Sequence, residues 1–572
     1  MKACFFSVLS LLLLSSTCFA QFPGGGFPGN GRGFQGGGFP GGGFPGGFGG
    51  RFPVTDQQEG GQMPGGFPGG FGDGLGGGFG MNAEYNPASS RNDVEFTSSN
   101  LPIVIIDTDG QSLTNRQKTA AAMRIIDNGS RRNKITDRAN GYDGNIKIKL
   151  RGNSSLFFDQ KRFTLETVDP QGKELDVELL GMPAEHDWVL LAPYNDISMM
   201  RDVFAFDMWN NMGHWAPRTR YCEVVMNGKY IGVYILCEKI KRGENRLDIA
   251  KLKSTDVSGL DITGGYIVRI DPPDEGEKSF QSDVPGIITN GMGGGFGAGF
   301  PGGGGFPGGG MGARATVTWT YLYPKSDKIT KEQEEYISNY IKTVEKVIQS
   351  DDFANPDKGY AQYISVSSFV DYLIHTELSL NADGLKRSTY FYKTKQNPDG
   401  TGGKLHAGTV WDYNLAYGNC NFSNANKIDA WVYEGGETNP TPAMWKRLME
   451  DPAFVARVKT RWQELRKGHL SDENINRFID EHAAILKESQ ARQYAKYPDL
   501  LVPANSNNGN NRNNGFPGMG GFPGGGMGGF PGGGGGAGMF AAYRVSSYDE
   551  EIATLKKWFT DRIAFLDSNW GK

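Results

Sequence analysis

The 572-residue chain is predicted to adopt an α+β fold, with strands in its N-terminal half and helices in its C-terminal half. In the first half, short β-rich runs alternate apolar and polar residues. In the second half, apolar residues recur at helical spacing. A third observation concerns glycine, because most of the 85 glycines fall in Gly/Phe/Pro-rich tracts at 21–81, 286–312 and 509–538. Outside these tracts the glycine content is ordinary, so we expect one large globular body that carries them.

The first 20 residues have the pattern of a signal peptide. Lys2 supplies the positive charge, Phe5 begins a short apolar run, and small residues precede a cleavage point after Ala20. We therefore expect a secreted, extracytoplasmic protein. No later apolar run reaches the length that spans a bilayer, so we also expect no membrane span in the mature protein.

Residues 21–95 are rich in Gly, Phe and Pro and cannot bury enough apolar surface to offset the entropy of ordering. We expect this region to be disordered. Similar segments at about 285–313 and 503–541 interrupt the globular domain, predicted at 96–572, and are interpreted as inserts at exposed loops. The repeated phenylalanines suggest self-association through the tracts.

Charge and cysteine content exclude several classes of protein. The net charge is −4 and no block of five like charges occurs, which argues against nucleic acid or an anionic membrane as the main partner. The predicted mature chain keeps Cys222, Cys237 and Cys420 and has no CxxC motif. A zinc ribbon and a disulfide scaffold are therefore not expected, and at least one thiol must be free.

The strand predictions follow apolar alternation and turn residues. Asn227 and Gly228 separate two β-rich runs and favour a hairpin with a type I′ turn. A helix is expected around 199–211. The strands predicted in this half are 101–107, 145–151, 161–166, 221–226, 229–236 and 264–270.

Helical periodicity dominates the second half. Ser547 and Glu550 resemble a capping box at the start of the last helix. One strand pair interrupts the helices, because two extended runs, 388–393 and 404–412, flank a turn at 397–400. The predicted helices are 330–350, 366–380, 452–466, 473–495 and 547–568.

This strand pair suggests a chemical site. If the two runs form a hairpin, Asp383 and Asp412 are nearly symmetric about its turn and meet at its open end. Two adjacent carboxylates can bind a hard divalent cation, combine a base with a metal ligand, or share a proton. The alternative is structural, with Asp383 in an Asx turn and Asp412 capping a helix.

Basic residues of the first half suggest a site for an anion. Lys161 lies two residues before Phe163 in a predicted strand, so both side chains should point to the same, buried face. A buried lysine needs an anionic partner, and Glu238 is a candidate. A strand lysine paired with a glutamate positions nucleotide phosphates in kinases. Lys161 could instead extend its ammonium group to water.

Two arginines are further candidates for anion binding. The loop that begins at Arg151 could bind phosphate through its N–H groups or be an ordinary turn. Arg201 could bind an anion or cap local structure.

Taken together, the motifs resemble the CotH kinase family, secreted atypical protein kinases similar to spore coat protein H. The resemblance covers about 98–572 apart from the two inserts. The stretches that carry it are Arg151-Gly-Asn-Ser-Ser155 with Lys161, Gly181-Met-Pro183, Asp187-Trp-Val-Leu190, Tyr194-Asn-Asp196 with Arg201, Asn227–Tyr234, Glu238-Lys-Ile240, Gly264-Gly-Tyr266, Asn381-Ala-Asp383-Gly384, Trp411-Asp412-Tyr-Asn414, Gly418-Asn419, and Ser547-Tyr548 with Lys557-Trp558 and Arg562.

The resemblance implies a two-lobed kinase-like fold that uses ATP with Mg²⁺ or Mn²⁺. Asp383 would be the catalytic residue, and Asp412, with Asn414, would hold the metal. The expected reaction moves the γ-phosphoryl group of ATP to Ser or Thr hydroxyls of secreted or surface proteins. The residues expected to bind ATP are Lys161, Arg151, Glu238 and Arg201.

Two positions depart from the family pattern. Asn414 stands where many members carry a second Asp, and Ser388 stands where many carry Asn. Asn is a neutral, weaker metal ligand than Asp. The alternative function is therefore a catalytically weak or inactive kinase-like scaffold that acts as a surface or matrix interaction protein. A two-carboxylate glycosidase would leave Lys161 unexplained.

Overall fold

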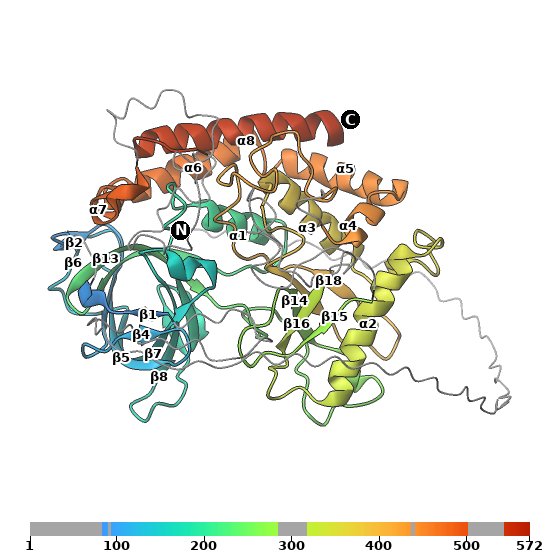
Figure 1. Ribbon diagram of the computed structural model, residues 1–572, viewed down its shortest axis with the longest axis horizontal. Helices are drawn as coiled ribbons and strands as arrows, with labels where there is room; N and C mark the ends of the chain where they lie inside the picture. The colour runs from blue at the N-terminus through green and yellow to red at the C-terminus, as the bar shows by residue number, and fades with distance from the viewer. Residues whose placement is uncertain (1–82, 90–92, 284–316, 436–440, 502–542, 572) are drawn as a thin grey trace, which may run out of the picture. The chain divides into compact units, whose positions relative to one another are not determined.

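The computed structural model describes residues 83–89, 93–283, 317–435, 441–501 and 543–571. The predicted signal peptide, most of the N-terminal Gly-rich region and nearly all of both inserts lie outside these residues. The α+β prediction is confirmed, because strands dominate the first half of the chain and helices dominate the second (Figure 1).

Seven strands of the first half close into a barrel in the order β11-β13-β12-β3-β5-β7-β8. Neighbours pair antiparallel except β12 and β3, which are parallel. Alternate residues fill its interior, among them Ile148 and Phe163, as the alternation predicts. The bounds are β3 (Ile103–Asp107), β5 (Thr119–Ile126), β7 (Tyr142–Arg151), β8 (Arg162–Val168), β11 (Asp187–Leu191), β12 (Thr219–Met226) and β13 (Lys229–Glu238).

The β12–β13 hairpin has the predicted turn. Met226 pairs with Lys229, and the two residues between them, Asn227 and Gly228, have φ of 49° and 75°. Positive φ at both central positions is what a type I′ turn requires, and Asn-Gly adopts it with little strain.

Six short strands form three antiparallel pairs, β1 with β4, β2 with β6, and β9 with β10. Their bounds are β1 (Glu84–Tyr85), β2 (Ser98–Ser99), β4 (Leu113–Thr114), β6 (Asn133–Lys134), β9 (Val177–Leu179) and β10 (Met182–Glu185).

A second, five-stranded antiparallel sheet has the order β15-β16-β14-β17-β18. Helix α2 (Lys331–Gln349) begins with a capping box on Thr330 and packs against this sheet, where Tyr336 stacks on Tyr266. Figure 1 shows α2 beside β15 and β16. The strands are β14 (Tyr266–Ile270), β15 (Ser279–Gln281), β16 (Thr318–Tyr323), β17 (Thr389–Lys393) and β18 (Leu405–Ala407).

The predicted helix at 473–495 is in fact two helices. The break lets α6 pack on α8 while α7 packs on barrel strand β13. Gln493 of α7 accepts a hydrogen bond from Val233 N of β13 at 2.9 Å, which fixes that contact. The helices besides α2 are α1 (Arg201–Asn211), α3 (Val366–Ser379), α4 (Ala443–Leu448), α5 (Pro452–Arg466), α6 (Asp472–Leu486), α7 (Ser489–Lys496) and α8 (Tyr548–Trp570).

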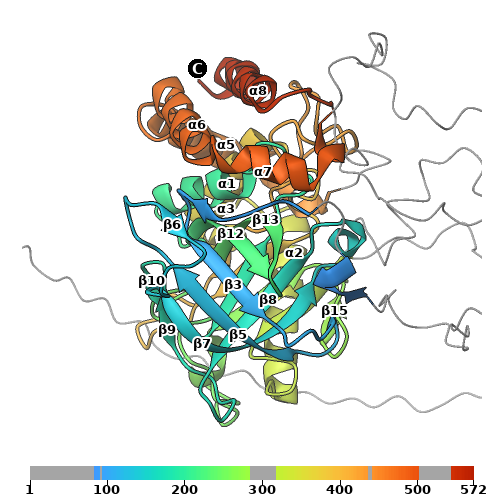
Figure 2. The same cartoon turned by 90° about the vertical axis from the view of Figure 1, so that its left-hand side faces the viewer.

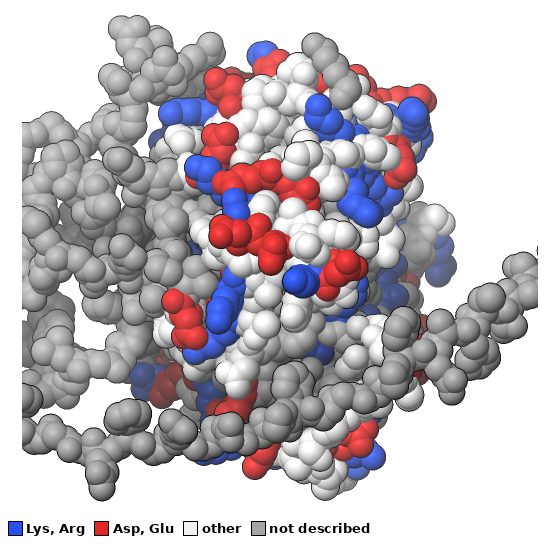
Figure 3. Space-filling model, turned by 90° about the vertical axis from the view of Figure 1, so that its right-hand side faces the viewer, with Lys and Arg blue, Asp and Glu red and all other residues white. Residues whose placement is uncertain are grey.

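The cysteines and the helices of the structure agree with the sequence analysis. Cys222, Cys237 and Cys420 are all buried free thiols. Among the described residues, no helix is both long and apolar enough to cross a membrane. On the face viewed in Figure 3, acidic and basic side chains are interspersed, as the small net charge suggests.

Arg201, the first residue of α1 and a predicted ATP ligand, connects buried acidic groups. Its fully buried guanidinium donates from Nη1 to Asp196 Oδ1 at 2.5 Å and to Glu551 Oε1 at 2.7 Å. Nη2 donates to Tyr543 Oη at 2.7 Å, and Nε donates to Ala416 O at 3.1 Å. Protein groups thus contact the guanidinium on all sides, and ATP binding by Arg201 stays a prediction.

Replacing this arginine should unfold the protein more easily. Arg201→Met leaves the buried carboxylates of Asp196 and Glu551 without their cation, so we expect a loss of about 3–5 kcal/mol in the free energy of unfolding. Urea unfolding followed by circular dichroism measures it. The matched control, Arg457→Met on the exposed face of α5, should change stability by about 0.5 kcal/mol or less. Equal effects of the two substitutions would contradict the structural role.

Candidate active site

The strand pair that carries the predicted carboxylates forms a hairpin. Phe391 of β17 pairs with Ala407 of β18, and Tyr392 pairs with His406. Asp383 lies in the segment that enters β17, and Asp412 lies in the segment that leaves β18. The chain therefore brings the two aspartate segments to the open end of the hairpin, as the symmetry about the turn predicts.

Asn381 connects the two aspartate segments. Its Oδ1 accepts a hydrogen bond from Asp383 N at 3.2 Å, and its Nδ2 donates to Asp412 O at 3.4 Å. Burial raises the pKa of Asp383 above its ordinary value, and the charge of Asp412 adds to this rise. Arg387 and Lys386 oppose it. The two carboxylates thus interact within one site.

The backbone of this site is held in unusual conformations. Asp412 has φ of 66°, and Leu380, Leu385 and Ser388 around Asp383 also have positive φ. Residues other than glycine rarely adopt the left-handed region, and when they do they often lie at functional sites. After Asp412 the chain turns, so that Tyr413 N donates to Asp202 Oδ1 of α1 at 2.6 Å.

Arg162 is a site residue that the sequence analysis missed. It is the first residue of β8, and its Nη1 lies 2.7 Å from Asp412 Oδ1. Phe163 fills the barrel, so its neighbour Arg162 points outward. The alternation of side chains over 161–166 could have identified it, because Arg162, next to Lys161, must face the opposite side of the strand.

Asp202 lies close to this ion pair. Burial raises the pKa of Asp202 to about 7, the positive charge of Arg162 opposes the rise, and Asp412 adds to it. Arg162 is itself buried. The site therefore contains a buried cation that interacts with two carboxylates, Asp412 directly and Asp202 through the electrostatic field.

The predicted pair of Lys161 and Glu238 does not form. Lys161 Nζ donates to the carbonyls of Leu156 at 2.7 Å and Phe158 at 2.5 Å. Glu238 instead accepts hydrogen bonds from Arg218, from Nη2 at 2.8 Å and Nε at 3.0 Å.

Strand register explains why this pair is wrong. Phe163 pairs with Leu190 of β11, whereas Glu238 pairs with Trp188. Continued past β8, the register places Lys161 about four residues, or about 13 Å, from Glu238 along the sheet.

Arg151, which the sequence predicts to bind phosphate, contacts an aromatic ring beside Asp412. Its guanidinium stacks over Trp411 at 4.7 Å from the ring centroid, next to Asp412 in the sequence. Arg151 also pairs with Arg162 across β7 and β8. Such a cation–π contact stabilises the arginine in this position.

More cations follow Arg151 along the outer face of the barrel. Lys149 shares this face of β7, two residues before Arg151. Burial and the charges of Lys239, Lys149 and Lys325 lower the pKa of Lys118 to about 8, with Asp187 opposing the shift. Burial also lowers the pKa of Lys239, which interacts with Arg151 and with Asp187, 3.2 Å away. Glu166 and Asp187 lie on the same face and pair with Lys118, Lys147 and Lys239, so cations outnumber carboxylates there but do not stand alone.

Asn414 lies two residues after Asp412 and is buried. Its Nδ2 donates to Asn195 Oδ1 at 2.9 Å, and its carbonyl accepts from Asn419 Nδ2 at 2.8 Å. These contacts fix the backbone just beyond Asp412, and a role for Asn414 as a metal ligand stays a prediction. The oxygen donors of Asp383 and Asp412 are of the type that Mg²⁺ and Mn²⁺ prefer.

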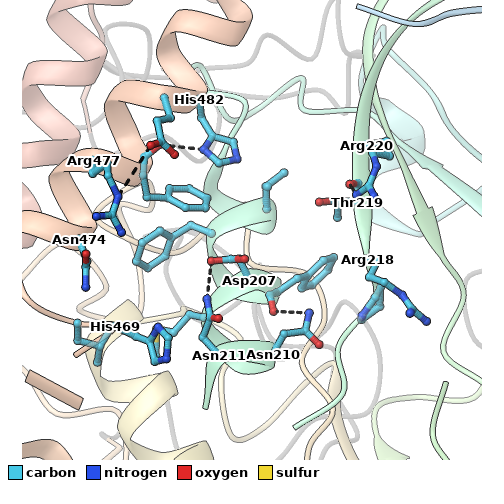
Figure 4. A pocket seen from close by; sticks show the side chains of 18 residues that line it. Asp207, Asn210, Asn211, Arg218, Thr219, Arg220, His469, Asn474, Arg477 and His482 are labelled. Atoms are coloured by element: carbon cyan, nitrogen blue, oxygen red, sulfur yellow. Dashed lines mark hydrogen bonds and ion pairs between the residues drawn. The ribbon is translucent and has the colours of Figure 1, made fainter. Parts of the chain in front are cut away.

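A separate cavity of about 430 Å³ lies on another side of α1. Figure 4 shows Asp207 and Asn211 of α1 in one wall, joined by a hydrogen bond of 2.8 Å, and His482 of α6 in another. Arg218 and Arg220 enter from the start of β12. The described residues that line it include none of the predicted site residues, so the cavity is distinct from the carboxylate site.

Comparison with known protein families gives a match over most of the chain. The model described as CotH kinase protein matches residues 148–566, which is well over half of the chain. The matched range begins in β7, ends in α8, and includes all the predicted site residues. A search of curated proteins found no match.

The raised pKa of Asp202 predicts a pH dependence of stability. Between about pH 4 and pH 7 the folded protein keeps a proton on Asp202 that the unfolded chain has released. Stability should therefore fall as pH rises through this range. Asp202→Asn keeps an acceptor for Tyr413 N but cannot ionise, so its curve of stability against pH should be flatter than that of wild type. Thermal unfolding from pH 4 to 8 measures both, and identical curves would contradict the raised pKa.

Proposed function

This chain belongs to the CotH kinase protein family, and we propose that it transfers the γ-phosphoryl group of ATP to Ser or Thr hydroxyls of secreted or surface proteins. Family membership implies ATP use. The observation that carries the proposal is the placement of Asp383 and Asp412 in one site, connected by Asn381 and flanked by Arg162 and Arg151. In this proposal the barrel and the helix-rich half act as the two lobes of a kinase-like fold.

Asp383 is the proposed catalytic base. Burial and Asp412 raise its pKa, which makes it a better proton acceptor than an exposed aspartate. The acceptor hydroxyl oxygen attacks the γ-phosphorus, the bond from that phosphorus to the β,γ-bridging oxygen breaks, and ADP leaves. The hydroxyl proton passes to Asp383. In-line transfer needs little covalent help from the protein, so positioning and charge supply most of the catalysis.

Asp412 is the proposed metal-binding residue. A bound Mg²⁺ or Mn²⁺ would neutralise negative charge on the phosphates. Arg162 holds Oδ1 of Asp412 at 2.7 Å, and Asn381 holds the backbone carbonyl of Asp412. These contacts orient the carboxylate before substrate binds, which lowers the entropy lost on binding.

The basic outer face of the barrel is the proposed site for the triphosphate. Arg151 lies beside Trp411, and Lys149 and Lys239 extend the positive charge away from Asp412. Lys161 already donates to two carbonyl groups and in this account supports the loop before β8. We place the reaction outside the cytoplasm because residues 1–20 have the pattern of a signal peptide.

One observation favours the alternative of a weak or inactive scaffold. A metal ion at Asp412 must compete with Arg162, which already neutralises that carboxylate from a buried position. Asn414 adds no charge to attract the ion. In this second candidate function, the Gly/Phe tracts would provide self-association and the kinase-like body would act as a support.

Substitution of either aspartate should strongly reduce transfer in protein that circular dichroism shows to be folded, although Asp412→Asn also removes the charge that pairs with Arg162 and should lower stability by about 3–5 kcal/mol. Asp383→Asn removes the proton acceptor, for which we expect a loss of about 10²–10⁴-fold, and Asp412→Asn weakens the metal site and should cost at least about 100-fold. Phosphate incorporation from ATP labelled in its γ-phosphate, with Mn²⁺ or Mg²⁺, measures transfer to the protein itself and to secreted proteins. Asp351→Asn on an exposed turn is the matched control and should keep wild-type rates.

Two results would count against the proposal. Wild-type rates in either aspartate variant would contradict the assigned site. A wild-type protein that transfers no phosphate with either metal, and that loses self-association when 21–81, 286–312 and 509–538 are deleted, would favour the scaffold instead.

A further inference from the structure

A histidine and several carboxylates meet on the barrel side of the molecule, where β10 leads into β11. His186 Nδ1 lies 2.6 Å from Asp176 Oδ1 and 2.9 Å from Glu185 Oε1. The ligand atoms of these three residues all lie within 4.8 Å of one another. Figure 2 shows β9 and β10 at one side of the barrel, away from the helices α6 and α8.

We propose that Asp176, Glu185 and His186 bind a divalent cation of the zinc class, at a site separate from Asp412. One imidazole nitrogen and two carboxylate oxygens are a ligand set that Zn²⁺ accepts, with bonds of about 2.0–2.2 Å. In a tetrahedral site such bonds place ligand atoms roughly 3.4 Å apart. The side chains need to open only slightly to reach that spacing.

The second nitrogen of the imidazole supports this assignment. His186 Nε2 lies 3.5 Å from Glu174 Oε2 and 3.7 Å from Asp187 Oδ2. A metal-bound histidine typically donates its other N–H to a carboxylate, which fixes the ring and strengthens the ligand. Nε2 now lies 3.3 Å from Lys241 Nζ, and once a metal ion displaces this ammonium, Glu174 and Asp187 are the carboxylates placed to accept its N–H.

Neighbouring basic side chains would compete with a metal ion for these carboxylates. Lys241 Nζ lies 2.9 Å from Glu185 Oε1, 3.1 Å from Asp187 Oδ2 and 3.3 Å from His186 Nε2. Lys239 pairs with Asp187 at 3.2 Å, and Arg246 lies 3.8 Å from Glu185. Lys241 is therefore the main competitor for the oxygen of Glu185.

Exposure at the site allows a cation to enter. The side chain of Asp176 is 65% exposed, whereas those of Glu185 and His186 are 15% and 18% exposed. The fold therefore holds Glu185 and His186 in place, and the exposed Asp176 would move in from solvent to complete the site. A bound ion would connect the segment before β9 to the junction of β10 and β11 and stabilise that edge of the barrel.

Zinc titration of the full-length protein tests the site. Calorimetry in buffer with excess Mg²⁺ should show one equivalent of Zn²⁺ bound by wild type and also by Asp412→Asn. His186→Ala should weaken this binding at least tenfold, Glu174→Gln should weaken it about tenfold, and Lys241→Gln should strengthen it. His469→Ala, an exposed histidine before α6, is the control and should bind as wild type. Zn²⁺ should raise the unfolding temperature of wild type but not of His186→Ala.

Several outcomes would overturn the inference. One is the absence of saturable Zn²⁺ binding, which would mean that Lys241 satisfies the carboxylates alone. Another is binding that persists in both His186→Ala and Asp176→Asn; the exposed Asp176 makes that second variant informative even if the first fails to fold. Binding lost in Asp412→Asn would place the ion at the candidate active site. Failure of phosphotransfer would leave this test unaffected, because it measures zinc binding alone.

Discussion

The ion pair between Arg162 and Asp412 is the interaction on which the candidate site depends. It joins the first residue of β8 to the segment that follows β18, residues 250 positions apart. A largely buried arginine must have an anionic partner, since an unpaired charge would cost several kcal/mol. The pair therefore sets where Asp412 lies, next to Asp383 and to the ring on which Arg151 stacks.

Helix α1 contacts the residues on either side of Asp412 and so helps to hold this pair. Asp202 accepts the N–H of Tyr413, and Phe206 stacks on Trp411 at 5.7 Å between ring centroids. At the same helix end, Arg201 joins Asp196 and Glu551 and so connects α1 to α8. The cavity of Figure 4 borders another side of α1, so a change in this helix would reach both places.

Local patterns in the sequence predicted part of this arrangement. Alternation predicted β7 and β8, Asn227 and Gly228 predicted the turn between β12 and β13, and symmetry about another turn predicted that Asp383 and Asp412 meet. Closure of the barrel was not predicted, because strand pairing such as that of β3 with β12 depends on residues far apart in the sequence. The same reason explains why the partner of Arg201 was missed, because Glu551 lies 350 residues away. Arg218 could have been found, since it faces Glu238 across the predicted β12–β13 hairpin. The alternation of side chains along a strand does not show which face of that strand contacts the second half of the chain. For this reason Lys161 was chosen over Arg162.

ATP binding by the purified protein, measured calorimetrically with and without Mn²⁺ for wild type and Asp412→Asn, tests the proposed metal–nucleotide site. We expect wild type to bind ATP at least tenfold more tightly with Mn²⁺ than without it, and we expect Asp412→Asn, measured well below its unfolding temperature, to lose this gain. Equal binding by the two proteins, or no binding by wild type with either Mn²⁺ or Mg²⁺, would contradict a metal–nucleotide site at Asp412.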